Sequence, residues 1–183
     1  MKILLFLTLV LQLVFPEMEK QQYKEAYSYI NNCENLKELD KKICKEKNSM
    51  QFPVNVIKEV YPLSVLIFGN EIIENDIMSD VGAKNNKIND FVTEFDKENK
   101  FEPVDNEMFE KLFSNNPKSQ LYVAFSKPIG NMLFAEIAYN LNPNVEIKSI
   151  KDLTTFNKTL ALLFVFDENG KIKKVKKHIN QYN

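Results

Sequence analysis

The chain has 183 residues, a formal net charge of −1 and 44% apolar residues. This length and composition are typical of one globular domain with its own core. All 24 basic residues are lysine, which excludes the guanidinium recognition of phosphate and guanine that arginine provides. One histidine, His178, and two cysteines cannot build a zinc site of several histidines or of four cysteines. We therefore expect no metal, no cofactor and no nucleic-acid partner.

The first residues have the outline of a secretory signal, because Lys2 precedes a continuous apolar run from Ile3 to Phe15. As a helix, this run is too short to cross the hydrocarbon core of a bilayer. No small residue marks a cleavage site near Phe15, so an uncleaved anchor is the alternative. We expect residues 1–16 to be a signal peptide or N-terminal anchor, and the chain to be secreted or periplasmic. Membrane contact is then expected only through this segment, if it is not cleaved.

Residues 17–116 are predicted to be mainly helical, within a single domain that extends over residues 17–183. Apolar residues from Tyr23 to Ile30 recur at helical spacing, and Asn35 is placed to cap a second helix. Shorter patterns predict one or two helical turns in 52–62, a buried strand or the start of a helix in 63–69, a surface loop in 79–90, and helices in 90–101 and 106–113.

The C-terminal part, residues 120–179, is predicted to form an antiparallel sheet. Apolar runs separated by turn residues place its strands at 121–125, 132–141, 159–166 and 171–179. The third run has apolar residues on both faces, as expected for a central strand covered on both sides, and the turn after it contains Gly170. The predicted fold class is therefore α+β, with N-terminal helices packed on a C-terminal antiparallel sheet of about four strands.

Cys33 and Cys44 are the only cysteines, and an even pair in an exported protein favours a disulfide. On one continuous helix, however, their Cα atoms would lie about 16 Å apart. A disulfide needs a Cα separation below about 7 Å, so pairing requires the chain to turn back between them. The alternative is two thiols that pack as small core residues.

Charge is unevenly distributed along the chain. The densest basic cluster lies in the last predicted strand and consists of Lys171, Lys173, Lys174, Lys176 and Lys177. One interpretation is a solvated edge whose charge discourages pairing with another sheet and complements the acidic segment 67–116. The other is a surface that binds a protein or an anionic component of the cell envelope.

Four polar residues are candidates for catalysis. Glu136 stands inside an apolar strand, so it is either a general acid in a partly apolar cleft or a solvent-facing residue on a half-exposed sheet. Ser126 and Lys127 are adjacent and should point to opposite faces, which argues against a Ser–Lys pair. His178 is expected at the surface of an edge strand.

These features favour an exported binding protein without catalytic activity. The first alternative is a hydrolase that uses the carboxylate of Glu136. The second is a carrier of a small apolar ligand, with Phe134, Phe164 and Phe166 lining its cleft. The preferred interpretation of these three residues is that they pack in the core.

Overall fold

The computed structural model describes residues 17–39, 54–63, 66–74, 87–116, 119–141, 147–154 and 158–182. The segment 1–16 and Cys44 lie outside these residues, as does most of the predicted loop 79–90. Within the described ranges, no helix has the length and apolar content needed to cross a membrane.

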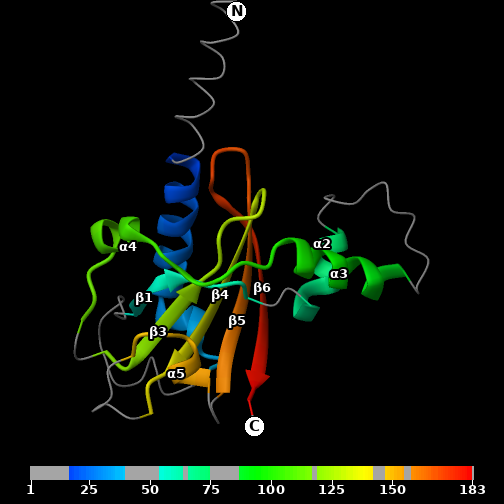
Figure 1. Cartoon of the computed structure of the whole chain (residues 1–183). Coiled ribbons are helices and arrows are strands. Elements are labelled where there is room, and N and C mark those ends of the chain that lie inside the picture. Colours follow the sequence, from blue (N-terminus) through cyan, green and yellow to red (C-terminus); the bar gives the residue numbers. More distant parts are fainter. Residues whose placement is uncertain are drawn as a thin grey trace, which may run out of the picture.

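The centre of the fold is a six-stranded sheet with the order β2-β1-β3-β4-β5-β6 (Figure 1). Its strands are β1 (Asn55–Val60), β2 (Val104–Asp105), β3 (Leu121–Phe125), β4 (Met132–Tyr139), β5 (Lys158–Phe166) and β6 (Ile172–Gln181). The mixed α+β class and the four C-terminal strands are as predicted. The prediction of about four strands in a purely antiparallel sheet is wrong, because β1 and β2 extend the sheet and β1 pairs with β3 in parallel.

The strand β1 replaces the helical turns predicted for this part of the chain. Its backbone pairs with β3 and β2, and the side chain of Asn115 accepts from the N–H of Val56 (2.8 Å) and donates to its carbonyl (3.0 Å). Val56 and Ile57 are both buried, on opposite faces of the sheet. Tertiary pairing therefore gives these β-branched residues a covered strand position that the local pattern did not reveal.

The helical elements are a helix over 17–30, here called the N-terminal helix, η1 (Cys33–Leu36), η2 (Leu66–Phe68), α2 (Gly69–Glu74), α3 (Lys87–Glu98), α4 (Glu107–Leu112) and α5 (Lys151–Thr154). Asn35 does not cap a second α-helix. Instead, the side chain of Asn32 caps the short 3-10 helix η1 by accepting from the N–H of Glu34 (3.1 Å). The prediction of helices near 90–101 and 106–113 is confirmed, although α3 already begins at Lys87.

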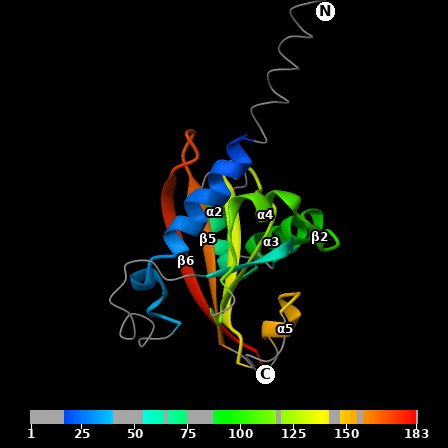
Figure 2. The same cartoon turned by 90° about the vertical axis from the view of Figure 1, so that its left-hand side faces the viewer.

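One face of the sheet, here called the core face, is covered by the N-terminal helix and α4 (Figures 1 and 2). Tyr23 is fully buried there, with its ring centroid 4.8 Å from Phe109 and 5.5 Å from Phe125. Its hydroxyl donates to the carbonyl of Ser126 (2.9 Å). Packing and a buried hydrogen bond thus attach the helix to the end of β3.

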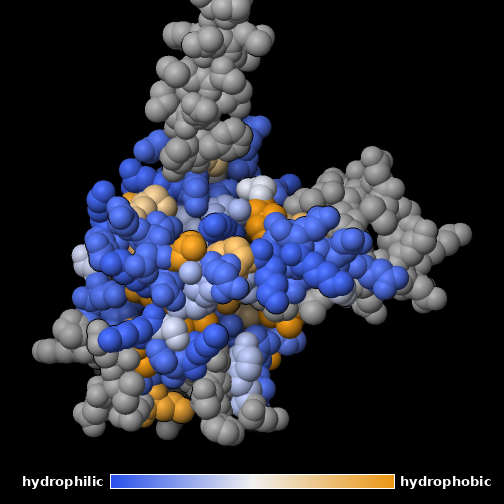
Figure 3. Space-filling view, viewed as in Figure 1, coloured by the Kyte–Doolittle hydropathy of each residue, from blue (hydrophilic) through white to orange (hydrophobic). Residues whose placement is uncertain are grey.

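The opposite face, here called the pocket face, is covered in two separate places. Near one end, Phe68 and Ile72 of η2 and α2 pack on Met132 and Phe134 with Phe95 of α3. Toward the other end, Ile150 packs with Ala124 and Ala138 next to α5. Figure 3 shows a mostly hydrophilic surface over α3 and α4, with small hydrophobic areas between them. The region of β4 between the two covers includes Glu136.

The turn between β5 and β6 confirms the role predicted for glycine. Gly170 has φ +71°, a backbone conformation that residues other than glycine rarely adopt. A Cβ atom at this position would also stand 3.1 Å from the side chains of Met18 and Gln21. The turn therefore lies directly against the N-terminal helix.

Replacing Tyr23 with phenylalanine removes only the hydroxyl group and leaves the carbonyl of Ser126 without this donor. We expect Tyr23→Phe to lower the free energy of unfolding by about 1–2 kcal/mol. The matched control is Tyr29→Phe on the same helix, since the Tyr29 hydroxyl makes no hydrogen bond within the described residues. Urea denaturation measures both changes, and equal losses would contradict the role assigned to the Tyr23 hydroxyl.

Candidate functional site

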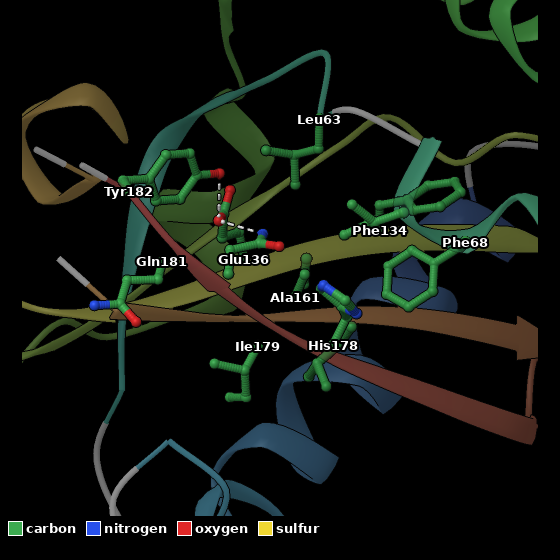
Figure 4. A pocket seen from close by; sticks show the side chains of 13 residues that line it. Leu63, Phe68, Phe134, Glu136, Ala161, His178, Ile179, Gln181 and Tyr182 are labelled. Atoms are coloured by element: carbon green, nitrogen blue, oxygen red, sulfur yellow. Dashed lines mark hydrogen bonds between the residues drawn. The ribbon is translucent and has the colours of Figure 1, made fainter. Parts of the chain in front are cut away.

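A pocket of about 350 Å³ opens on the pocket face, between the two covers of the sheet. Its apolar wall consists of Leu63, Ile67, Phe68, Phe134 and Ala161 (Figure 4). Two of the large hydrophobic side chains that remain exposed, Ile67 (37%) and Tyr182 (39%), both border this pocket. Exposed apolar side chains thus border a concave site, as is common for sites that bind small molecules.

The register of three strands creates the hollow. Glu136 on β4 pairs with Ala161 on β5, and Ala161 pairs with His178 on β6. These three side chains therefore form one row on the pocket face, with Glu136 and His178 on either side of Ala161 (Figure 4). The methyl group of Ala161 fills little of the space between two larger side chains. A small residue at the centre of the row thus leaves room for a ligand.

Glu136 is buried, with only 7% of its surface exposed. Three side chains donate to its Oε1 atom: the hydroxyl of Thr159, the amide of Asn180 (3.1 Å) and the hydroxyl of Tyr182 (2.8 Å). Within the described residues, no group donates to Oε2. The interpretation of Glu136 as a solvent-facing residue is therefore incorrect, because the end of β6 and the flanking covers enclose it.

The hydroxyl of Tyr182 is held in its neutral, donating form. Burial, and after it the negative charge of Glu136 and their hydrogen bond, raise the pKa of Tyr182 to about 12. The carboxylate thus accepts a hydrogen bond from a phenol that stays protonated at neutral pH.

His178 lies at the exposed rim of the same pocket. Two strand spacings separate its backbone from that of Glu136, which corresponds to about 10 Å. The side chain of His178 makes no ion pair or hydrogen bond with another described residue. The structure therefore brings the two predicted residues to one site without direct contact between them.

The lysines of β6 do not form one continuous surface. The register places Lys174 and Lys176 on the pocket face and Lys177 on the core face, whereas Lys173 lies at the register irregularity between Ile172 and Lys174. Lys171 contacts Glu25 (2.5 Å), Lys176 contacts Glu71 (3.5 Å), and Lys177 contacts Glu38 (3.5 Å). Binding of a protein or an anionic envelope component by this cluster stays a prediction.

The other residues singled out in the sequence make contacts that stabilise the fold. The hydroxyl of Ser126 donates to the carbonyl of Lys127 (2.7 Å) and accepts from the N–H of Phe134 (3.1 Å), so its hydrogen bonds are with the backbone. The ammonium group of Lys127 lies 4.5 Å from the ring centre of Phe101. Cys33 packs against the main core, and its pairing with Cys44 stays a prediction because Cys44 lies outside the described residues. Of the predicted carrier residues, Phe134 lines the pocket whereas Phe164 and Phe166 belong to the core face.

Sequence reasoning missed Thr159, Asn180 and Tyr182, which complete the site. Their positions follow from strand alternation, since Asn180 and Tyr182 share the parity of His178 and Thr159 shares that of Ala161. The alternation does not reveal Asn180 and Tyr182, because the predicted strand ends at residue 179 whereas β6 continues to Gln181.

The site contains one carboxylate and no metal-ligand cluster. Among the described residues that line the pocket, Glu136 alone is acidic, and no group of three His, Cys, Asp or Glu side chains suited to a metal occurs in the described ranges. No family model, curated protein or solved structure matches this chain. Function is therefore inferred from the chemistry of the pocket itself.

Replacing Glu136 with glutamine keeps an acceptor for Tyr182 but removes the negative charge beside it. The pKa of Tyr182 should then fall below about 12 but stay above 10, because burial is the largest cause of its shift. Absorbance titration of tyrosine, with Tyr182→Phe used to identify the signal, measures this pKa. An unchanged value would contradict the contact between the two side chains.

The raised pKa of Tyr182 also makes the stability of the fold depend on pH. Since the pKa of Tyr182 is higher in the folded chain than its ordinary value of 10, its contribution to stability is complete below pH 10 and is lost as the pH rises through about 12. Over this interval the free energy of unfolding of Tyr182→Phe should decline less steeply than that of the unchanged chain. Urea denaturation at several pH values makes the comparison, and parallel curves would contradict it.

Proposed function

We propose that this chain is an exported binding protein without catalytic activity, and that it holds a small ligand in the pocket around Glu136. The observation that carries this proposal is a buried carboxylate on the wall of a concave, largely apolar site of about 350 Å³. Few polar groups among apolar walls are typical of sites that orient a small ligand, and this volume lies at the lower end of their usual range.

Binding accounts for the arrangement better than hydrolysis does. A glycosidase-type mechanism needs two carboxyl groups on either side of the scissile bond. Among the described lining residues, the pocket has only one, and its Oε1 atom is already occupied by Thr159, Asn180 and Tyr182. His178 lies two strand spacings from Glu136, and no hydrogen bond joins the two side chains within the described residues, so His178 does not supply a paired proton donor.

The proposal of export rests on the N-terminal sequence alone. One lysine followed by the apolar run from Ile3 to Phe15 is typical of a segment that directs secretion.

Small aromatic and aliphatic fragments should bind in this pocket and shift the backbone amide NMR signals of Phe134, Ala161 and His178. Ala161→Leu fills the hollow between Glu136 and His178, so we expect it to abolish these shifts. The control, Val104→Leu, adds apolar volume on the exposed strand β2 at the other edge of the sheet and should leave binding unchanged. The proposal fails if no fragment shifts the pocket signals, or if Ala161→Leu leaves them intact while the chain remains folded.

The intact mass of the protein from its own cells tests export. Loss of about 15–25 residues from the N-terminus is the expected result. Alkylation of Cys33 and Cys44 only after reduction would in addition establish the predicted disulfide. A full-length chain with readily alkylated thiols would overturn the proposal of a cleaved, exported protein.

A further inference from the structure

We infer that the ligand of this pocket is an organic ammonium ion with an apolar body. This inference rests on the proposed function and adds the charge and shape of the ligand. It follows from three properties of the site: a buried negative charge that no cation among the described residues contacts, a carboxylate oxygen to which no described residue donates, and aromatic side chains in the wall.

The first property is the missing counter-ion. Glu136 is 7% exposed, yet no lysine of the described residues forms an ion pair with it. Lys176 lies on the same face of β6, but its ammonium group contacts Glu71 of α2. Buried carboxylates are usually paired with a cation, because removal from water is costly for an isolated charge. A cationic ligand would supply the counter-charge that the described part of the chain does not.

The second property is that only one of the two carboxylate oxygens of Glu136 accepts hydrogen bonds from the described residues. Thr159, Asn180 and Tyr182 all donate their hydrogen bonds to Oε1. A dashed line in Figure 4 marks the bond from the Tyr182 hydroxyl to this atom. The three bonds hold the carboxylate in one orientation and leave Oε2 as an acceptor. An ammonium group donates hydrogen bonds and carries the opposite charge, so it matches Oε2 in both respects.

The third property is the wall of the pocket. The rings of Phe68 and Phe134 lie 6.1 Å apart and border the pocket on the side away from Tyr182 (Figure 4). Aromatic faces attract cations and also bury apolar groups. A ligand with an ammonium group at Oε2 can therefore place its apolar body against Phe68, Phe134 and Leu63.

Other ligand classes fit less well. An anion would be repelled by Glu136, and His178 stands about two strand spacings away on β6. A divalent metal ion needs several oxygen or nitrogen ligands, and no such group is present in the described ranges. A neutral apolar molecule would fill the walls but leave the buried charge uncompensated.

Three probes of nearly the same shape separate these possibilities: phenethylammonium, phenethyl alcohol and phenylacetate. We expect the ammonium probe to bind at least about tenfold more tightly than the alcohol, and phenylacetate to bind most weakly. Titration followed by the amide signals of Phe134, Ala161 and His178 gives the three dissociation constants. This comparison uses the unchanged chain, so it does not depend on the folding of any variant.

Glu136→Gln then tests the origin of the preference. Its amide oxygen can still accept from Thr159, Asn180 and Tyr182, but its charge is gone, so the ammonium probe should bind no better than the alcohol. Glu168→Gln makes the same charge change on the exposed turn between β5 and β6 and should keep the preference. Tyr182→Phe retains the negative charge and should also bind the ammonium probe more tightly than the alcohol.

The outcomes distinguish this inference from the proposed function. Equal binding of phenethylammonium and phenethyl alcohol would overturn the inference while leaving the pocket as a ligand site. A preference for the ammonium probe that persists in Glu136→Gln would also overturn it, because the charge of Glu136 would not be its source. If no probe shifts the pocket signals, both the inference and the proposed function fail.

Discussion

The register of β4, β5 and β6 is the constraint on which the rest of the structure depends. Leu133, Phe164 and Val175 form one cross-strand row that packs against the N-terminal helix, whereas Glu136, Ala161 and His178 form a row on the opposite face. Because side chains alternate along a strand, a slip of one residue would turn Glu136 toward the apolar core. The burial of the core face therefore also fixes which polar residues meet in the pocket.

The pocket exists because its face of the sheet is only partly covered. The covers formed by η2, α2 and α3 and by the segment at α5 lie on either side of Glu136, and the small side chain of Ala161 leaves the space between them unfilled. The contact between Lys176 and Glu71 joins β6 to α2 across this region. This ion pair links the basic cluster to the acidic segment 67–116, whereas Lys171 and Lys177 contact acids of residues 17–39.

Glu136 links the stability of the fold to the chemistry of the site. Its hydrogen bonds with Asn180 and Tyr182 attach the end of β6 to the centre of the sheet, and the same bonds orient the carboxylate in the pocket. A buried charge of this kind lowers stability unless it is compensated, and neutral donors compensate it only in part. Neutral donors on Oε1, and an Oε2 atom that accepts from no described residue, together explain why one residue serves both as a structural anchor and as a candidate ligand contact.

The sequence by itself determined the four C-terminal strands, the turn at Gly170 and the presence of an acid inside an apolar strand, because alternation and turn residues are local signals. Tertiary structure decided that residues 55–60 form β1 and that the sheet is mixed, since β1 pairs with β3 more than 60 residues away. It also decided that Glu136 is buried, through donors 23, 44 and 46 residues distant. Burial depends on what covers a side chain, and here the cover comes from segments that only folding brings together.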